Sequence, residues 1–441
     1  MNPLFYFYLL IVLWVSPFTV KGQGSQSVIN DFLNDSAVRT GHAGISIYEP
    51  ATGKYLYNYN EEKNFIPSST VKLFTLYAGM KYLGDSVPAM KFAEDDSTLL
   101  IYSTGDPTFL HPDFKDQRLF DLLKITPKQI ILQNPFFESF AYGAGWSWED
   151  YTEEFMIERS SFPIYGNALR YTQDENRVHF FPKEIREKNN RPSSPWRFNG
   201  NLQSGRYYRE FHSNNKFKVG KNELRSGNFL LPFITSDSLT LALLGDTLHK
   251  IVLDEPDLNS KIYTHAVSRF YSRPVDSLFR PMMFNSDNFF AEQTLLMVSN
   301  EKLGYMSDSE IIDSLLSKEL KDIPTKPRWV DGSGLSRYNL FSPKDFIYIL
   351  NKIKKEFGKK RVNNILPAGG QGTLMGYYEK EGDAIHAKSG SMSNNVSLSG
   401  YLVTEKKREL VFSVIVNNFS GSGRACRKAI EGFLKEIRRI N

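Results

Sequence analysis

Strands of an antiparallel type are predicted at both ends of the chain, and this restricts the fold more than any other feature of the sequence. Residues 43–49 and 54–59 are rich in β-forming side chains and flank the turn sequence at 50–53, so they predict a hairpin. Near the C-terminus, three strands and an amphipathic helix are predicted at residues 384–389, 396–403, 409–416 and 424–439. We therefore expect one antiparallel sheet, flanked by helices and built from both ends of the chain.

The middle of the chain, residues 87 to about 260, follows a different pattern. It is richer in aromatic residues, Asn and short apolar runs, with weak periodicity and scattered Gly and Pro, which is typical of short strands and loops. At 441 residues the chain is long enough for about two to three domains with separate cores. The sequence therefore predicts an α+β protein with a large, mostly β insertion.

Charge and cysteine content narrow the classes of partner. The net charge of +5 is spread along the chain and is too small to indicate a dedicated nucleic-acid-binding surface. Cys426 is the only cysteine and the seven His show no metal-ligand spacing, so we expect no disulfide, no metal and no cofactor. Basic clusters at residues 352–361 and 424–439 are expected to be solvated helix faces, with peripheral contact to an anionic wall or membrane surface as the alternative.

The N-terminus has the pattern of an export signal. Residues 4–15 form an uninterrupted apolar run that is too short to span a bilayer comfortably. Val20 and Gly22 then supply small residues at the spacing of a cleavage site, so residues 1–22 are predicted to be a signal peptide cleaved after about Gly22. We expect a periplasmic or otherwise exported protein, with an uncleaved anchor as the alternative, because the first three residues carry no Lys or Arg.

Three short motifs occur in a diagnostic order. Ser-Thr-Val-Lys at 69–72 starts a predicted helix, with Ser68 and Ser69 as candidate caps, Ser-Asp-Asn at 286–288 precedes another, and Lys-Ser-Gly at 388–390 ends a predicted strand. A lone Ser-x-x-Lys is weak evidence, since residues 213–216 and 299–302 have the same spacing. The three motifs in this order constitute the acyl-serine signature of penicillin-binding proteins and serine β-lactamases.

These residues suit acyl transfer. Ser69 would attack a carbonyl carbon while Lys72, on the same helix face, takes its proton. An ordinary lysine pKa of about 10.4 leaves almost no neutral amine at pH 7, so partial burial and a second cation at Lys388 are expected to lower it. Ser286 could pass a proton to the leaving amine, and Asn288 could hold a substrate amide.

The Lys-Ser-Gly segment supplies the remaining binding groups. Lys388 and Ser389 offer a charge and a hydroxyl to a free carboxylate. Gly390 completes this segment, and the backbone N–H groups of Ser69 and Ser391 are candidates for an oxyanion hole. Asp287 is interpreted as a helix-start charge rather than a catalyst.

The sequence around these motifs resembles that of the D-alanyl-D-alanine carboxypeptidase/endopeptidases of the class C low-molecular-mass penicillin-binding proteins. The matching segments are residues 67–74, 105–108, 331–340, 366–369, 372–374 and 387–393. The resemblance implies a penicillin-binding/transpeptidase-like domain at 23–86 and 262–441, a large inserted domain at 87–261, and a smaller nested domain at about 174–226. Ser389 stands where the family usually has Thr and keeps the hydroxyl.

The same resemblance implies a pocket for the substrate residue that precedes D-Ala-D-Ala, often diaminopimelate. An Asp paired with an Arg would suit a head group with one ammonium and one carboxylate. By motif, this pocket maps to Asp150, Leu335, Arg337, Met392 and Ser393, with Glu149 as the alternative to Asp150.

The implied activity is that of a serine D-Ala-D-Ala carboxypeptidase acting on peptidoglycan stem peptides through an acyl-enzyme, with β-lactams as covalent inhibitors. Endopeptidase activity on cross-links uses the same acyl-enzyme and stays open. A β-lactamase or esterase of the same superfamily and a non-catalytic wall-binding protein are the alternatives.

Overall fold

The structure is a computed structural model that describes residues 23–133, 137–173, 178–182, 196–199, 207–211, 215–219, 227–254 and 267–441. The signal peptide predicted at 1–22 and much of the nested domain predicted at 174–226 lie outside the described residues.

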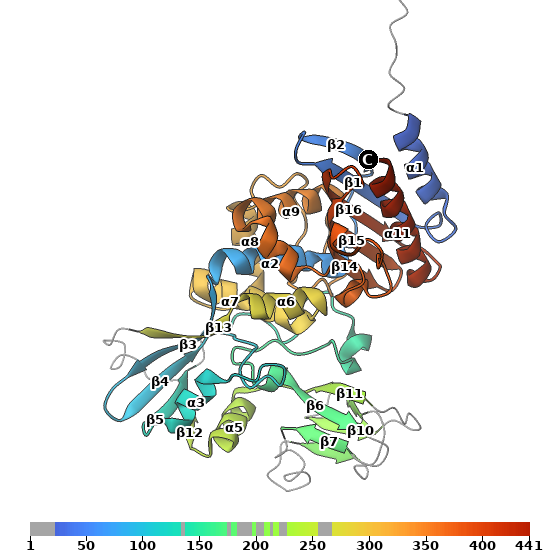
Figure 1. The fold of residues 1–441 in the computed structure, drawn as a ribbon. Coiled ribbons are helices and arrows are strands. Elements are labelled where there is room, and N and C mark those ends of the chain that lie inside the picture. Colours follow the sequence, from blue (N-terminus) through green and yellow to red (C-terminus); the bar gives the residue numbers. More distant parts are fainter. Residues whose placement is uncertain are drawn as a thin grey trace, which may run out of the picture.

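A five-stranded antiparallel sheet joins the two ends of the chain, in the order β14-β15-β16-β1-β2. Its strands are β1 (His42–Glu49), β2 (Lys54–Tyr59), β14 (Ile385–Met392), β15 (Asn395–Val403) and β16 (Glu409–Asn417). β1 pairs with β16 along its length, so the blue and red strands of Figure 1 form one sheet. The predicted sheet is confirmed, and β14 and β2 are its two edge strands.

Helices cover both faces of this sheet. On one face α11 (Gly423–Ile440) contacts β15 and carries α1 (Gln23–Asn34), whose Phe32 ring lies 4.9 Å from that of Phe433. On the other face α9 (Pro343–Phe357) contacts β1 and β16 and packs on α2 (Lys72–Tyr82). Side chains alternate along β14, so Ala387 joins the core beneath α11, whereas Lys388 belongs to the opposite face.

A helical layer around α2 completes this part of the molecule. It contains α6 (Asp276–Phe284), α7 (Asn288–Leu303), α8 (Asp308–Ser317) and α10 (Lys359–Ile365). The α7 helix is buried all around over residues 289–300. Asp287 caps it, because its Oδ1 accepts a hydrogen bond from Phe290 N–H at 2.8 Å. The predicted helix-start role of Asp287 is therefore confirmed.

The helix start at the first motif differs from the prediction. Ser68–Val71 forms a 3₁₀ turn, η1, which runs directly into α2, and no side chain caps either helix. Ser68 has a φ of +51°, and the Ser69 hydroxyl accepts a hydrogen bond from Lys72 instead of capping the backbone. The expected cap is wrong because the serine side chain is used within the site.

The inserted region contains a second five-stranded sheet, in the order β12-β5-β4-β3-β13. Its strands are β3 (Ser86–Glu94), β4 (Thr98–Ser103), β5 (Gln129–Gln133), β12 (Val252–Asp254) and β13 (Ser268–Pro274). The helices α3 (Arg118–Ile125) and α5 (Asp237–Leu248) pack beside it, in the lower part of Figure 1. β13 belongs to this sheet although it follows residue 261, the expected end of the insertion.

Two three-stranded sheets, β11-β6-β7 and β8-β10-β9, form the rest of the inserted region. Their strands are β6 (Ala168–Gln173), β7 (Val178–Phe181), β8 (Arg197–Asn199), β9 (Tyr207–Arg209), β10 (Lys216–Val219) and β11 (Gly227–Pro232). Within the part of the chain that the structure describes, no helix combines the length and apolarity needed to cross a bilayer. Cys426 is fully buried on α11, and burial raises the pKa of its thiol.

Candidate active site

Lys72 is the centre of the site. It lies at the first position of α2 and is completely buried. Its Nζ donates three hydrogen bonds, to Ser69 Oγ at 3.2 Å, to Asn288 Oδ1 at 2.7 Å and to the carbonyl oxygen of Ser333 at 2.7 Å. Because an ammonium group has three N–H donors, these three contacts use all of them and fix the orientation of Nζ toward Ser69.

Burial lowers the pKa of Lys72 to about 8. Loss of solvation penalises the ammonium form, and it outweighs the opposing effect of the carboxylates of Asp331, Asp287 and Glu292. The expected lowering is thus present, but complete burial is its main cause rather than a neighbouring cation. An amine with this pKa can take a proton from the Ser69 hydroxyl at neutral to slightly alkaline pH.

A second buried lysine lies on the edge strand. Lys388 Nζ donates to Ser286 Oγ at 2.9 Å and to the carbonyl oxygen of Ser389 at 2.7 Å. Burial and the nearby Lys72 amine hold the pKa of Lys388 well below its usual value. Ser286 has a φ of +60° at the turn before α7. The turn thus places Ser286 against Lys388 and, two residues on, Asn288 against Lys72.

Two glycines allow the backbone to close around Ser69. A Cβ at Gly390 would lie 2.7 Å from the carbonyl oxygen of Pro67 and 2.9 Å from Ser69 N, so only glycine lets β14 approach η1 this closely. Gly334 has a φ of +85°, and a Cβ there would collide with the carbonyl group of Ser68. The β14 edge and the 331–336 loop therefore hold the Ser69 backbone from two directions.

We expect Gly334→Ala to reduce the rate of acylation by about 100-fold, because the added methyl group must displace the backbone next to Ser69 by a large fraction of an ångström. Gly84→Ala is the matched control: Gly84 has a similar φ of +72° but nothing within 4 Å of its Cβ position. Both variants carry a backbone penalty of about 1 kcal/mol, and Gly334→Ala adds the cost of the collision with Ser68. Stopped-flow acylation is therefore compared at a temperature well below the unfolding transition of both variants. Equal acylation rates in the two variants would contradict this account.

Ser391 N–H and Ser69 N–H are the predicted oxyanion donors. Ser391 follows Gly390 on the free edge of β14, the edge that faces η1. The Ser391 side chain is exposed and its Oγ accepts a hydrogen bond from Arg427 at 3.4 Å, so its hydroxyl is directed away from Lys72 and Lys388. The role of the Ser391 N–H in an oxyanion hole stays a prediction.

The structure brings only part of the predicted substrate pocket together. Asp150, on η2 (Trp148–Thr152), is half-buried, which raises the pKa of its carboxyl, and the charge of Arg337 acts against that rise. Arg337 and Asp150 are therefore neighbours across the two parts of the fold. Met392 and Ser393, at the end of β14, form no hydrogen bond with either, all four being described residues.

The 331–336 loop lies in a segment that the family resemblance includes, but its contact with Lys72 was not predicted. It follows a buried Asp331 that accepts hydrogen bonds from Gly334 N–H, Ser336 N–H and the Asn339 amide. This carboxylate organises the turn that aims the carbonyl group of Ser333 at Lys72. Leu335, a predicted pocket residue, is half-buried on the same loop. The sequence Asp-Gly-Ser-Gly indicated a turn, but not that the turn is buried against the base.

An antiparallel sheet whose edge strand lies against a Ser-x-x-Lys helix defines the penicillin-binding/transpeptidase-like class of fold. The sequence profile of the D-Ala-D-Ala carboxypeptidase 3 (S13) family matches residues 25–183 and 241–437. The chain belongs to this family.

Individual relatives agree with this assignment. D-alanyl-D-alanine carboxypeptidase DacB of Haemophilus influenzae is 25% identical over 411 residues, covering 82% of each chain. Penicillin-sensitive carboxypeptidase A of Dictyostelium discoideum is 22% identical over 473 residues, 90% of this chain and 88% of that protein. The crystal structure of penicillin binding protein 4 (dacB) from Haemophilus influenzae superposes with a TM-score of 0.72 at 22% identity, covering 93% of this chain and 98% of that one. The last similarity supports the predicted fold.

Proposed function

We propose that this protein is a serine D-Ala-D-Ala carboxypeptidase, with endopeptidase activity on peptide cross-links through the same intermediate. One observation carries the proposal: a fully buried lysine of lowered pKa donates to the Ser69 hydroxyl and is held there by two further acceptors. The family assignment and the names of the two relatives, both carboxypeptidases, support the substrate class.

The proposed reaction has two halves. Ser69 Oγ attacks the carbonyl carbon of the penultimate D-Ala as its proton moves to Lys72 Nζ. The N–H groups of Ser69 and Ser391 stabilise the oxyanion. The C–N bond then breaks, and Ser286 relays to the leaving amine the proton that Lys72 took, which leaves Lys72 neutral again. Water attacks the resulting ester as Lys72 takes a proton from it, and this proton passes to the Ser69 oxygen when the ester C–O bond breaks.

Binding groups surround these atoms. Lys388 and Ser389 would bind the terminal carboxylate beside Gly390, and Asn288 would hold the peptide amide. Penicillins carry a similar carboxylate beside a reactive amide, so we expect them to acylate Ser69. The relative from Dictyostelium discoideum is named penicillin-sensitive.

Export is part of the proposal, because the peptidoglycan substrate lies outside the cytoplasm. The signal peptide at 1–22 and contact of the basic helices with an anionic wall or membrane surface stay predictions. The domain division stays a prediction too, and the pairing of β13 with β3 favours a second boundary between Pro274 and Asp276 rather than at 261.

The function is tested with purified muropeptides. Monomeric pentapeptides and cross-linked dimers are incubated with the protein and analysed by mass spectrometry. Release of D-alanine establishes carboxypeptidase activity and loss of dimers establishes endopeptidase activity. Binding without any product would favour the non-catalytic alternative, and rapid turnover of penicillin without a lasting adduct would favour a β-lactamase.

Asp150→Asn should lower kcat/KM about tenfold for stem peptides that carry diaminopimelate at the third position. The substitution removes the charge that would bind the side-chain ammonium group beside Arg337, and a half-buried charged hydrogen bond contributes about 1.5–3 kcal/mol. Glu149→Gln is the control, because Glu149 is exposed and should have little effect. An effect of Glu149→Gln larger than that of Asp150→Asn would assign the role to Glu149.

A further inference from the structure

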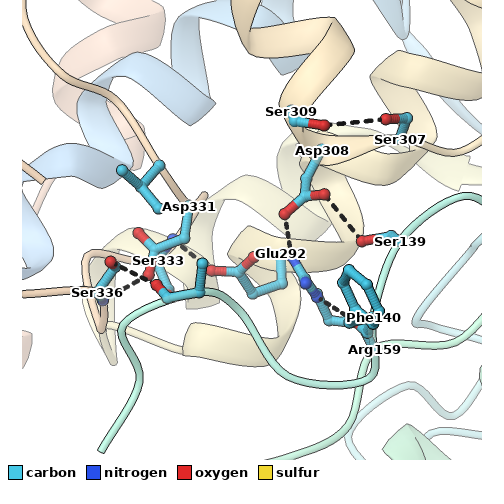
Figure 2. Close-up of polar contacts among 12 residues, drawn as sticks. Ser139, Phe140, Arg159, Glu292, Ser307, Asp308, Ser309, Asp331, Ser333 and Ser336 are labelled. Atoms are coloured by element: carbon cyan, nitrogen blue, oxygen red, sulfur yellow. Dashed lines mark hydrogen bonds and ion pairs between the residues drawn. The ribbon is translucent and has the colours of Figure 1, made fainter. Parts of the chain in front are cut away.

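A fully buried arginine of the inserted region reaches into the helical layer of the catalytic part. The side chain of Arg159 is 1% exposed. Its guanidinium group contacts Glu292 Oε2 at 3.3 Å and Asp308 Oδ2 at 2.6 Å, and its Nε donates to the carbonyl oxygen of Phe140 at 2.9 Å. Figure 2 shows Arg159 between the two carboxylates, with Glu292 directed on toward Ser333.

Glu292 continues this chain of contacts to the catalytic base. Its Oε1 accepts a hydrogen bond from Ser333 N–H at 2.7 Å, while its Oε2 faces Arg159. The carbonyl group of the same Ser333 accepts from Lys72 Nζ at 2.7 Å. The buried Glu292 carboxylate thus holds the main chain of Ser333, and the carbonyl group of Ser333 orients the Lys72 amine. Arg159 of the inserted region in turn holds Glu292.

The inserted region contacts the same loop at further points. Trp146 Nε1 donates to Asp331 at 2.8 Å, and Ser336 Oγ donates to the carbonyl oxygen of Ala144 at 2.6 Å. Arg337 N–H donates to Gly145 O at 3.3 Å. The residues 139–159 therefore cover the 331–336 loop, and Arg159 provides the charged part of that cover.

We propose that Glu292 is a positioning residue for Lys72 that acts through the main chain of Ser333. Arg159 keeps Glu292 charged and oriented, and in this way the inserted region contributes to the positioning of the catalytic base. This inference rests on the proposed function, because it assigns a role around the proposed base. A purely structural ion pair is the competing explanation.

The electrostatics distinguish the two explanations. A carboxylate at 292 favours the ammonium form of Lys72, so its loss should lower the Lys72 pKa. An Arg charge is permanent, and without it the buried Glu292, whose pKa burial and Asp331 already raise, would bind a proton. The charged groups that act on Lys72 are Asp331, Asp287 and Glu292. Those that act on Glu292 are Asp331, Arg159 and Asp308, and Lys72 acts on Lys388.

The experiment compares Glu292→Gln and Arg159→Met with Asp308→Asn in the full-length protein. Asp308→Asn is the matched control, because it removes the other carboxylate paired with Arg159, and Asp308 forms no hydrogen bond with Ser333 in the described chain. Acylation by a fluorescent penicillin is measured as a function of pH. We expect the rate of acylation to rise with pH along an acid limb and then to reach a plateau. Glu292→Gln and Arg159→Met should lower the plateau rate about 10- to 100-fold. They should also shift the acid limb of the rate–pH profile to lower pH by about half a unit. Asp308→Asn should leave the limb in place.

A second readout does not depend on activity. NMR of protein labelled with ¹³Cε-lysine follows the titration of Lys72, assigned by its loss in Lys72→Met. The same downward shift should appear in Glu292→Gln and Arg159→Met and not in Asp308→Asn. Should the single variants fail to fold, the double variant Glu292→Gln/Arg159→Met, which removes both charges, carries the test.

The outcomes separate the two proposals. A wild-type protein that is not acylated, but whose Lys72 titration moves in the variants, would overturn the proposed function and leave the positioning role. The positioning role would be overturned if the wild type is acylated at Ser69 but neither the rate–pH profile nor the Lys72 titration moves in the variants. Equal shifts in all three single variants would also overturn it, since Asp308 forms no hydrogen bond with Ser333 among the described residues.

Discussion

Ser69→Ala is expected to abolish covalent labelling by penicillin and to reduce D-alanine release by about 10⁴-fold or more, as loss of a nucleophile does in other acyl-enzymes. The hydroxyl oxygen forms the bond to the acyl group, and no other hydroxyl receives a hydrogen bond from Lys72 in the described chain. The variant should fold normally, because Ser69 is only half-buried and loses a single contact. Gel fluorescence and mass spectrometry of the intact adduct measure the result.

Ser299→Ala is the control for this experiment. Ser299 begins another Ser-x-x-Lys sequence, but it lies buried within α7, where its hydroxyl bonds to Tyr305 O and Ser307 N–H. This variant should keep the adduct. A penicillin adduct that persists in Ser69→Ala would reject Ser69 as the nucleophile.

Lys72→Met should slow acylation by about 10³- to 10⁴-fold, because it removes the base while keeping a side chain of similar length. In the wild type, the rate should rise with pH up to about 8, where the Lys72 amine becomes neutral, and then level off. Lys302→Met is the matched control, since Lys302 pairs with Glu319 away from the site. An unchanged acylation rate in Lys72→Met would remove Lys72 from the mechanism.

The same substitution should change the pH dependence of stability. The pKa of Lys72 falls from 10.5 in the unfolded chain to about 8 in the folded protein, so between these values the unfolded state binds more protons. The free energy of unfolding therefore rises with pH across this window. Below pH 8 the buried amine costs about 3 kcal/mol. Lys72→Met removes this cost but leaves Asn288 and Ser333 unpaired, so we expect a net gain of about 1 kcal/mol at pH 7 that shrinks toward pH 10 in denaturant titrations.

The elements and motif residues that local pattern encodes were predictable from the sequence. The five strands of the catalytic sheet appear within a few residues of their predicted bounds. Ser69, Lys72, Ser286, Asn288 and Lys388 come together as the motif order predicted. The helix cap predicted at Ser68 or Ser69 was wrong: neither side chain caps η1 or α2, and the Ser69 hydroxyl faces Lys72 instead.

The support for the base could not be predicted, because its contacts join residues far apart in the chain. Arg159 meets Glu292 across more than a hundred residues, and neither belongs to a motif. A signal did exist in part: Glu292 is the one charged residue in the otherwise uncharged stretch 288–300, and a charge in a helix that is buried all around requires a partner. The sequence could not say which arginine supplies it.

The placement of α1 and α11 has a practical consequence. The two helices pack on each other on one face of the sheet (Figure 1). The side chain of Lys388 belongs to the other face, where Lys72 of α2 lies. A sensor surface attached through the end of α11 would therefore leave the Ser69 side of the molecule open to solution. Immobilised in this way, the protein would keep the Ser69 side accessible in a bead-based screen for covalent inhibitors.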